Sequence, residues 1–332
     1  MKDRKIAKQN KTIFQAIWGF LLRLPTALYM MLFLMLLYSF LVDRYFSWNN
    51  LSNIFSQSAP LLVLACGQTL IVLMQGTDLS LGAMVSAIGV LWFAFLNMGF
   101  PLIAAVLLSI SIGACFGCLN GVIAAKGLLP VFIVTLGTQN IFKSLAFLTS
   151  HEQTLYFSND LFRRIAKSGL LGLSWSVWIA LVCFFATWVI LRKTSFGMKI
   201  TGIGGNPEAL TLAGENSSRT TIAAFTSSGL MAAIAAFLLC CRIESGNPNA
   251  GNGMEFNSIA AVLLGGTSLR EGRGGVEGTI FGVLLLQILK SGLTQVGISS
   301  IYQNAIIGTA VLFAIILDEV FKNIRNRQEV MR

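Results

Sequence analysis

The sequence has few charges and few residues of the kinds that build soluble catalytic sites. Only 11% of its 332 residues are Asp, Glu, Lys or Arg, whereas an ordinary soluble domain carries about 25%. It holds a single histidine, His151, which excludes sites built on several histidines. No HExxH, GxxxxGK[ST] or GxGxxG pattern occurs, and these are the patterns typical of zinc proteases and nucleotide sites. We therefore expect no catalytic residues, no metal and no cofactor bound by this chain.

Carboxylates are also scarce within the apolar segments. We find no relay of acids there, so proton coupling through buried acids has no obvious carrier. The glycine- and arginine-containing loop 265–275 resembles a phosphate nest only in composition, because it matches neither nucleotide-binding pattern. If transport through this chain is driven by ATP, the ATP must be bound and hydrolysed by another subunit.

Long apolar runs make up most of the chain. The composition is 55% hydrophobic and the mean hydropathy is +0.73. Runs of roughly 18 to 25 residues suit helices that cross ~30 Å of hydrocarbon, where the backbone must satisfy its own hydrogen bonds. The sequence predicts an all-α polytopic membrane protein with about ten transmembrane helices, at residues 24–42, 57–75, 79–97, 101–126, 130–149, 174–192, 218–240, 255–268, 276–295 and 299–318.

The net charge of +10 follows this topology. With the N-terminus inside, Lys and Arg outside the spans favour the cytoplasmic side by about three to one, which is the positive-inside bias. This predicts a basic cytoplasmic segment at 1–23, one transmembrane domain at 24–318 and a basic cytoplasmic tail at 319–332. The charge thus suits a lipid bilayer and gives no reason to expect nucleic acid. Residues 12–23 suit an interfacial helix, although an extension of the first span fits almost as well.

One polar stretch, 197–219, lies between the sixth and seventh spans. Gly204 and Gly205 break the chain, Asn206 suits an N-cap, and Pro207 suits the first helical position. Glu208 then lies where the helix dipole favours negative charge. We predict a short helix over 207–213, ended by Gly214, within a cytoplasmic loop at 193–217. A capped helix between membrane spans is more than a connector needs, so we expect it to contact another protein.

Polar and small residues within the spans mark possible pathways and packing faces. The candidates for a translocation path are Gln68, Asn140, Lys143, Asn257 and Asn304. Two alternatives stay open, because the amides can bond neighbouring helices and a lysine in the outer third of a span can snorkel to the interface. Asp78 is positioned to cap the third span, and a role in gating stays open beside that. Glycines at spacing four predict close helix packing in two spans: Gly113, Gly117 and Gly121, then Gly278 and Gly282.

Three stretches together resemble one known family. They are GTDLSLG (76–82), GIGGNPEALTLAGENSSR (202–219) and MEFNSIAAVLLGGTSLREGRGGVEGTIFG (254–282). In this order and at these separations they resemble the membrane permease subunits of bacterial ABC importers of the ribose, galactose, xylose and autoinducer-2 type. The similarity runs from about residue 45 to 320. There are departures, since Asn257 stands where the family often has an acid and Glu215 where it usually has Ile.

The resemblance implies a permease subunit of the bacterial inner membrane that imports a sugar or sugar-like solute by alternating access. Its partners would be a second permease subunit, alike or different, an ABC ATPase that binds ATP and Mg, and a periplasmic solute-binding protein. The short cytoplasmic helix would be the coupling helix, with contacts from Asn206, Pro207, Glu208, Leu210, Leu212, Ala213 and Gly214. Two alternatives remain: a self-sufficient secondary carrier or facilitator for polar solutes, and a related permease for nucleosides or amino acids. The sequence shows no convincing inverted repeat that would favour the carrier.

Overall fold

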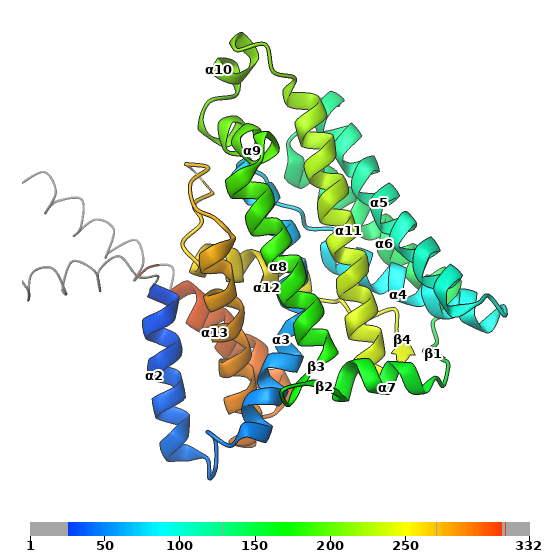
Figure 1. The fold of residues 1–332 in the computed structure, drawn as a ribbon, viewed down its shortest axis with the longest axis vertical. Coiled ribbons are helices and arrows are strands. Elements are labelled where there is room, and N and C mark those ends of the chain that lie inside the picture. The colour runs from blue at the N-terminus through cyan, green and yellow to red at the C-terminus, as the bar shows by residue number, and fades with distance from the viewer. Residues whose placement is uncertain (1–25, 128, 270, 314–315, 317–332) are drawn as a thin grey trace, which may run out of the picture.

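The structure is a computed structural model that describes residues 26–127, 129–269, 271–313 and 316, and this part of the chain is mainly helical (Figure 1). The expected basic segment 1–23, the interfacial helix 12–23 and the tail 319–332 lie outside the described residues. The helices are α2 (Thr26–Leu41), α3 (Trp48–Leu73), α4 (Leu81–Asn97), α5 (Leu102–Lys126), α6 (Val131–Ser150), α7 (Asp160–Lys167), α8 (Trp175–Lys193), α9 (Ser195–Gly205), α10 (Pro207–Leu212), α11 (Ser217–Ile243), α12 (Met254–Leu264) and α13 (Val276–Gln295), followed by a helix at Ser300–Phe313.

The strands are short and join loops at one end of the bundle. β1 (Leu155–Tyr156) pairs antiparallel with β4 (Ser245–Gly246), and β2 (Gly169–Leu170) pairs with β3 (Leu173–Ser174). The first pairing links the loop after α6 to the loop after α11.

Within the described part of the chain, six helices are long and apolar enough to cross a membrane, namely α3, α5, α6, α8, α11 and α13. Shorter apolar helices accompany them: α2, α4, α12 and Ser300–Phe313. The expectation of a helical crossing over 255–268 is wrong in one respect. Its helix, α12, has 11 residues, which at 1.5 Å per residue span only about 16 Å. Gly253, which has a positive φ, precedes its first residue, and Gly265 and Gly266 follow its last.

Small residues let the helices at the centre of the bundle approach closely, as the glycine spacing predicted. Along α5, Gly113 and Gly117 lie against the backbone of α11 around Phe225 and Gly229, and a β-carbon at Gly117 would collide with the Phe225 carbonyl. Gly278 of α13 likewise lies against Gly265 at the end of α12. The predicted packing faces are confirmed, and they place α11 between α5 and α3.

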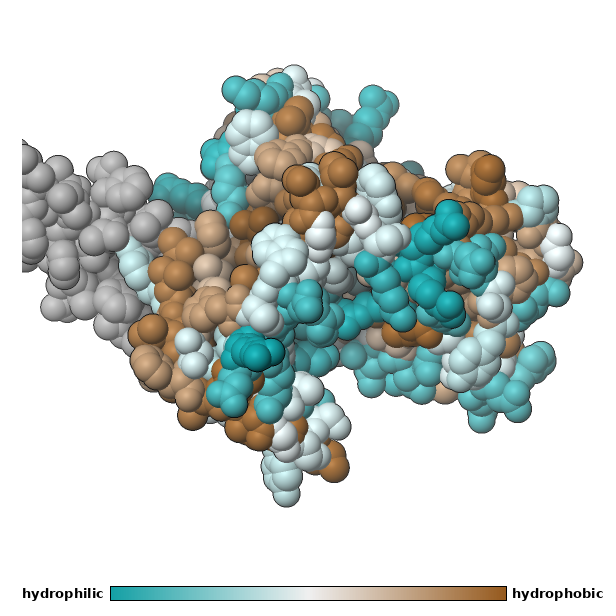
Figure 2. Space-filling model, turned by 60° about the horizontal axis from the view of Figure 1, so that its bottom comes forward, coloured by the Kyte–Doolittle hydropathy of each residue, from teal (hydrophilic) through white to brown (hydrophobic). Residues whose placement is uncertain are grey.

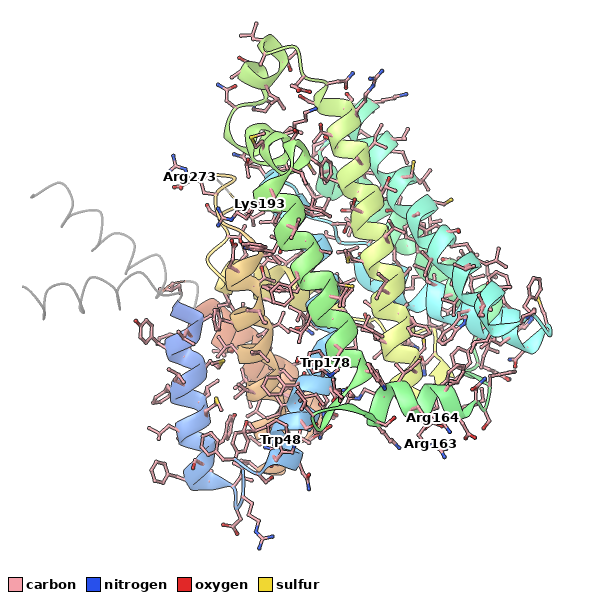
Figure 3. The ribbon with its side chains drawn as sticks, viewed as in Figure 1. Trp48, Arg163, Arg164, Trp178, Lys193 and Arg273 are labelled. Atoms are coloured by element: carbon pink, nitrogen blue, oxygen red, sulfur yellow. The ribbon has the colours of Figure 1, made fainter. Side chains whose placement is uncertain are left out.

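The bundle has two distinct ends. α10 and α9 lie at one end and α7 at the other, with α11 running between them (Figure 1). The 27 residues of α11 span about 40 Å, enough to cross a bilayer. Lys193 and Arg273 lie toward the α10 end, whereas Trp48, Arg163 and Arg164 lie toward the α7 end (Figure 3). Neither α7 nor α9 was predicted from the sequence.

Candidate functional site

α10 forms the tip of one end of the molecule, and its boundaries follow from local chemistry. Asn206 is the N-cap, because its Oδ1 accepts a hydrogen bond of 3.0 Å from the Ala209 N–H. Pro207 is the first helical residue and Glu208 lies in the first turn. The helix ends at Leu212, one residue earlier than expected, and Gly214 follows with φ +81°. The predicted capping is confirmed.

The side chains of α10 project away from their own chain. None of its residues is buried, and Leu212 is 89% exposed. A helix this short gains little stability unless it packs against something. Two contacts hold it to α9: Leu210 packs over Gly202, and the Lys199 ammonium lies 2.7 Å from the Glu215 carboxylate. α10 is therefore a well-capped helix that faces outward and whose segment is held to α9.

α9 connects this tip to the interior through Gly204. A β-carbon at Gly204 would collide with the Leu73 carbonyl oxygen at the end of α3, and it would lie 2.9 Å from the Cα atom of Gly272. The Gln75 side chain also donates a 2.6 Å hydrogen bond to the Gly204 carbonyl. The second and third sequence motifs meet here through Gly204 and Gly272, and Gln75 directly precedes the first motif.

The turn between α3 and α4 contains a group of buried polar residues that hydrogen-bond one another. Asp78 is fully buried, and its Oδ1 accepts hydrogen bonds from the Ser80 N–H at 2.9 Å and the Ser80 hydroxyl at 2.6 Å. The Asn120 amide donates to the Ser80 hydroxyl at 2.8 Å. The prediction that Asp78 caps this helix is wrong, because Ser80 occupies the N-cap position of α4. Asp78 instead organises the turn two residues before the cap. The Gln68 amide pairs with the Asp78 peptide N–H and C=O at 3.2 Å each, in the orientation that satisfies both groups.

A second buried carboxylate, Glu255, lies at the start of α12. It is 2% exposed, and its Oε1 accepts hydrogen bonds of 3.3 Å from the Gln139 amide and from the Gly253 N–H. Gly82 of the first motif packs against this carboxylate, where a β-carbon would collide with it. Lys143 lines the same small hollow, whose volume of ≈ 30 Å³ has room for a water molecule. Lys143 therefore borders a small polar hollow while its side chain remains exposed.

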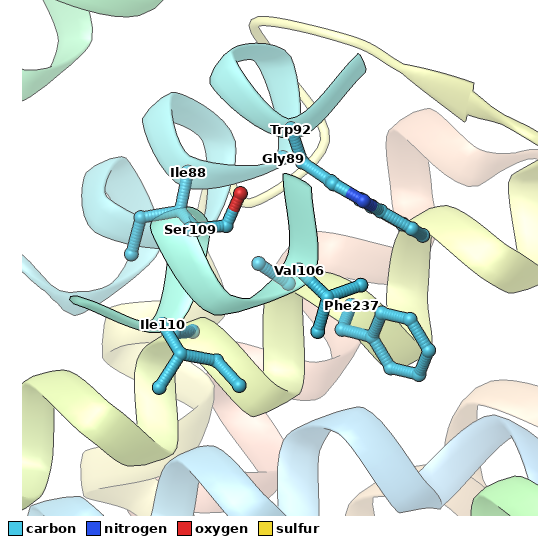
Figure 4. A pocket seen from close by; sticks show the side chains of 9 residues that line it. Ile88, Gly89, Trp92, Val106, Ser109, Ile110 and Phe237 are labelled. Carbon is cyan, nitrogen blue, oxygen red and sulfur yellow. The ribbon is translucent and has the colours of Figure 1, made fainter. Parts of the chain in front are cut away.

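A larger cavity lies between α3, α11, α12 and α13. Its volume is ≈ 320 Å³, and Asn257, Gln287, Arg242 and Lys290 are among the residues that line it. This volume is in the range of small-molecule sites. A separate apolar pocket between α4, α5 and α11, shown in Figure 4, has a volume of only ≈ 10 Å³ and is too small to bind a solute.

The five path candidates thus have different surroundings. Asn257 lines the large cavity and Lys143 the small hollow, while Gln68 bonds the buried turn. Asn140 is exposed and bonds the Leu136 carbonyl of its own helix at 3.1 Å, and Asn304 is exposed on the last described helix. The structure does not bring these five residues together at one site.

The sequence analysis missed several polar residues that the structure places in the interior. Glu255 is the first residue of the span predicted over 255–268, where a charge is ordinary, so its burial was not expected. Two buried carboxylates, Asp78 and Glu255, now lie within a region where no relay of acids was foreseen. Arg242, at the end of α11, was not among the path candidates, yet it lines the large cavity. The sequence signal that could have pointed to these residues was a charged side chain at the edge of an apolar run.

The α7 end presents a polar, mixed-charge surface. Arg163 of α7 bonds Glu244 at 3.3 Å, and this hydrogen bond raises the pKa of Arg163. Ser52 at the start of α3 donates a 2.7 Å bond to the Gly172 carbonyl, which ties the loop after α7 to the bundle. Hydrophilic side chains gather over much of this face, with hydrophobic ones toward its rim (Figure 2).

The fold and these hollows define a class: a multi-pass helical membrane protein with a cavity of mixed polar and apolar lining between its helices and an exposed capped helix at one end. A family model described as branched-chain amino acid transport system / permease component matches residues 50–316. The chain belongs to this family of permease components, and the resemblance to ABC importer permeases is confirmed. It is a permease subunit and not an enzyme, with ATP hydrolysis assigned to a separate subunit.

Curated relatives cover nearly the whole chain. The ribose import permease protein RbsC of Escherichia coli K12 is 35% identical over 292 residues, which are 87% of this chain and 91% of that protein. The fructose import permease protein FrcC of Rhizobium meliloti is 31% identical over 327 residues, 95% of this chain and 91% of that protein. The autoinducer 2 import system permease protein LsrC of Photorhabdus luminescens is 31% identical over 293 residues, 88% of each. No solved structure matches the chain.

Proposed function

We propose that this chain is the permease subunit of an ATP-driven importer for a sugar or sugar-like solute, which moves from the periplasm to the cytoplasm by alternating access. The relatives named above are import permeases for ribose, fructose and autoinducer 2, and polyhydroxylated solutes suit a cavity lined by amide side chains. The observation that carries the proposal is α10, a capped helix without a buried residue at one end of a membrane bundle.

We place α10 and both termini in the cytoplasm, and the α7 face in the periplasm. Lys126 ends α5 and Lys193 ends α8, and both lie at the α10 end together with Arg219 at the start of α11, as the positive-inside bias requires. The six long helices and the four shorter apolar ones then supply ten membrane-spanning segments. The one around α12 is completed by the non-helical residues beside that helix.

The partners follow from this orientation. α10 inserts into a groove of the ABC ATPase, through Glu208, Leu210 and Leu212 and their neighbours in the capped segment. The solute-binding protein docks on the polar α7 face. A second permease subunit, alike or different, completes the path. ATP and Mg stay on the ATPase.

A continuous series of contacts can carry a push on α10 to the cavity. α10 moves α9 through Leu210 and Gly202, and α9 meets the end of α3 and the loop after α12 at Gly204. The turn after α3 leads to Gly82, which packs on Glu255 at the start of α12. Asn257, half a turn further along α12, lines the cavity. Closure of the ATPases would thereby shift a residue of the solute path.

The test replaces both Glu208 and Leu212 with arginine, and then measures ATPase co-purification and solute uptake. Both side chains are exposed, so membrane insertion and folded yield should be unchanged, whereas a charged and bulky tip should prevent ATPase binding. The matched control is Leu171→Arg, because Leu171 is 75% exposed at the opposite end; that variant should retain the ATPase. If the double variant kept both the ATPase and uptake, the assignment of α10 would be refuted.

A further inference from the structure

The large cavity is open to the surface, since Lys290 and Asn252 are exposed and Arg242 is half-buried, and its charged residues are all of one sign. Two cations line it, Arg242 from the end of α11 and Lys290 from α13. None of its lining residues is acidic. Cations within or beside membrane-spanning helices normally pair with an opposite charge or face water or a pathway for a solute.

Neither cation has a protein partner within the part of the chain that the structure describes. The ion pairs found there join other residues: Arg163–Glu244, Arg192–Glu277, Lys199–Glu215 and Arg273–Glu271. Glu244 is only two residues from Arg242, but it pairs with Arg163 on the α7 face instead. The positive charge of Arg242 and Lys290 is therefore available to a ligand in the cavity.

The remaining polar groups add hydrogen-bond donors. The Gln57 carbonyl oxygen is occupied, since it accepts a 2.7 Å bond from the Gln287 amide, which leaves the Gln57 amide nitrogen to donate. A guanidinium and an ammonium offer only donors. Asn252 and Asn257 also line the cavity and can both donate and accept. The cavity thus offers cationic donors together with amides that can bind hydroxyl groups.

We propose that the imported solute carries an oxyanion, a carboxylate or a phosphate, in addition to its hydroxyl groups. Arg242 and Lys290 bind the oxyanion, and Asn252 and Asn257 bind hydroxyl groups. A sugar acid or a sugar phosphate has this chemistry. The inference rests on the proposed function, since it treats the cavity as part of the solute path, and it narrows the solute class within that function.

The experiment measures binding of two matched probes, D-gluconate and D-glucose, to the purified chain in an uncharged detergent by saturation-transfer NMR at millimolar concentrations. Gluconate should give a signal that inorganic phosphate displaces. Arg242→Gln and Lys290→Gln should each weaken gluconate binding about ten-fold, because each removes a charge-assisted hydrogen bond, while glucose binding changes less than two-fold. Lys193→Gln is the control, since Lys193 is exposed at the α10 end.

Several results would overturn the proposal. One is glucose binding as tightly as gluconate with neither substitution affecting gluconate, and another is the absence of any gluconate signal. A lipid headgroup supplies the same oxyanion, so the chain is also placed in bilayers with and without phosphatidylglycerol. If that lipid occupied the cavity in an Arg242-dependent way and excluded gluconate, the occupant would be lipid and not solute. ATPase co-purification tests the proposed function separately from the oxyanion inference. If the ATPase co-purifies with the chain but gluconate does not bind, the oxyanion inference fails and the proposed function stands.

Discussion

Gly204→Ala tests the contact through which α9 meets the interior. The added β-carbon collides with the Leu73 carbonyl oxygen, and overpacking of this kind costs ~1–3 kcal/mol. If α9 moves away, the 2.6 Å bond from Gln75 to the Gly204 carbonyl is lost as well, at ~1 kcal/mol. The higher helix propensity of alanine returns up to ~1 kcal/mol. The substitution therefore destabilises the contact between α9 and the end of α3 by a net ~1–3 kcal/mol.

A coupling free energy of this size corresponds to a ~5- to 150-fold change in the linked equilibrium. We therefore expect solute uptake per ATP hydrolysed to fall at least ~5-fold in Gly204→Ala, with the ATPase still bound through an unaltered α10. The assay reconstitutes the importer with its ATPase and binding protein in proteoliposomes, and it measures uptake and ATP hydrolysis in the same vesicles.

The neighbouring glycine provides the control. Gly205 is in the same helix, yet no atom from another part of the chain lies within 4 Å of the position that its β-carbon would take. Gly205→Ala should therefore transport as much solute per ATP as the wild type does. If both alanine variants transported equally well per ATP, Gly204 would have no part in coupling and the contact route through α9 would be wrong.

Two further predictions concern the bundle itself. Lys143→Met should reduce uptake without lowering the folded yield if Lys143 faces the path beside Glu255; unchanged uptake would show that the lysine only snorkels. Gly117→Leu should lower the folded yield severalfold, because the side chain would displace α11 at the Phe225 carbonyl. Gly137→Leu is its control, since no neighbouring helix comes within 4 Å of the position that its β-carbon would take, and equal yields of the two would contradict the packing argument.

Features fixed by neighbouring residues could be predicted from the sequence. The cap at Asn206, the proline at the first helical position and the left-handed Gly214 depend on residues within one or two turns. The glycines of α5 share one helix face, so their close packing was readable from spacing alone. The six long helices could also be predicted, because each one follows from a continuous apolar run in the sequence.

Features that depend on contacts between distant segments could not be predicted. α9 has the glycines of a loop, and its helix is secured where Gly204 meets Leu73 and Gly272. The cavity is lined by side chains from helices far apart in the sequence, so it could not be predicted that Arg242 and Lys290 line the same cavity. Glu255 sits at the edge of an apolar run, where its burial depends on Gly82 packing against it.

Identifying what co-purifies with the tagged chain from its native membranes, in mild detergent, tests the central claim most directly. The account predicts an ABC ATPase in stoichiometric amount, and its loss when Glu208 and Leu212 are both replaced with arginine. A permease chain of different sequence in the same preparation would make the pair a heterodimer. The contrary result is a chain that purifies alone and, in vesicles, moves a polar solute without ATP; it would identify a self-sufficient carrier.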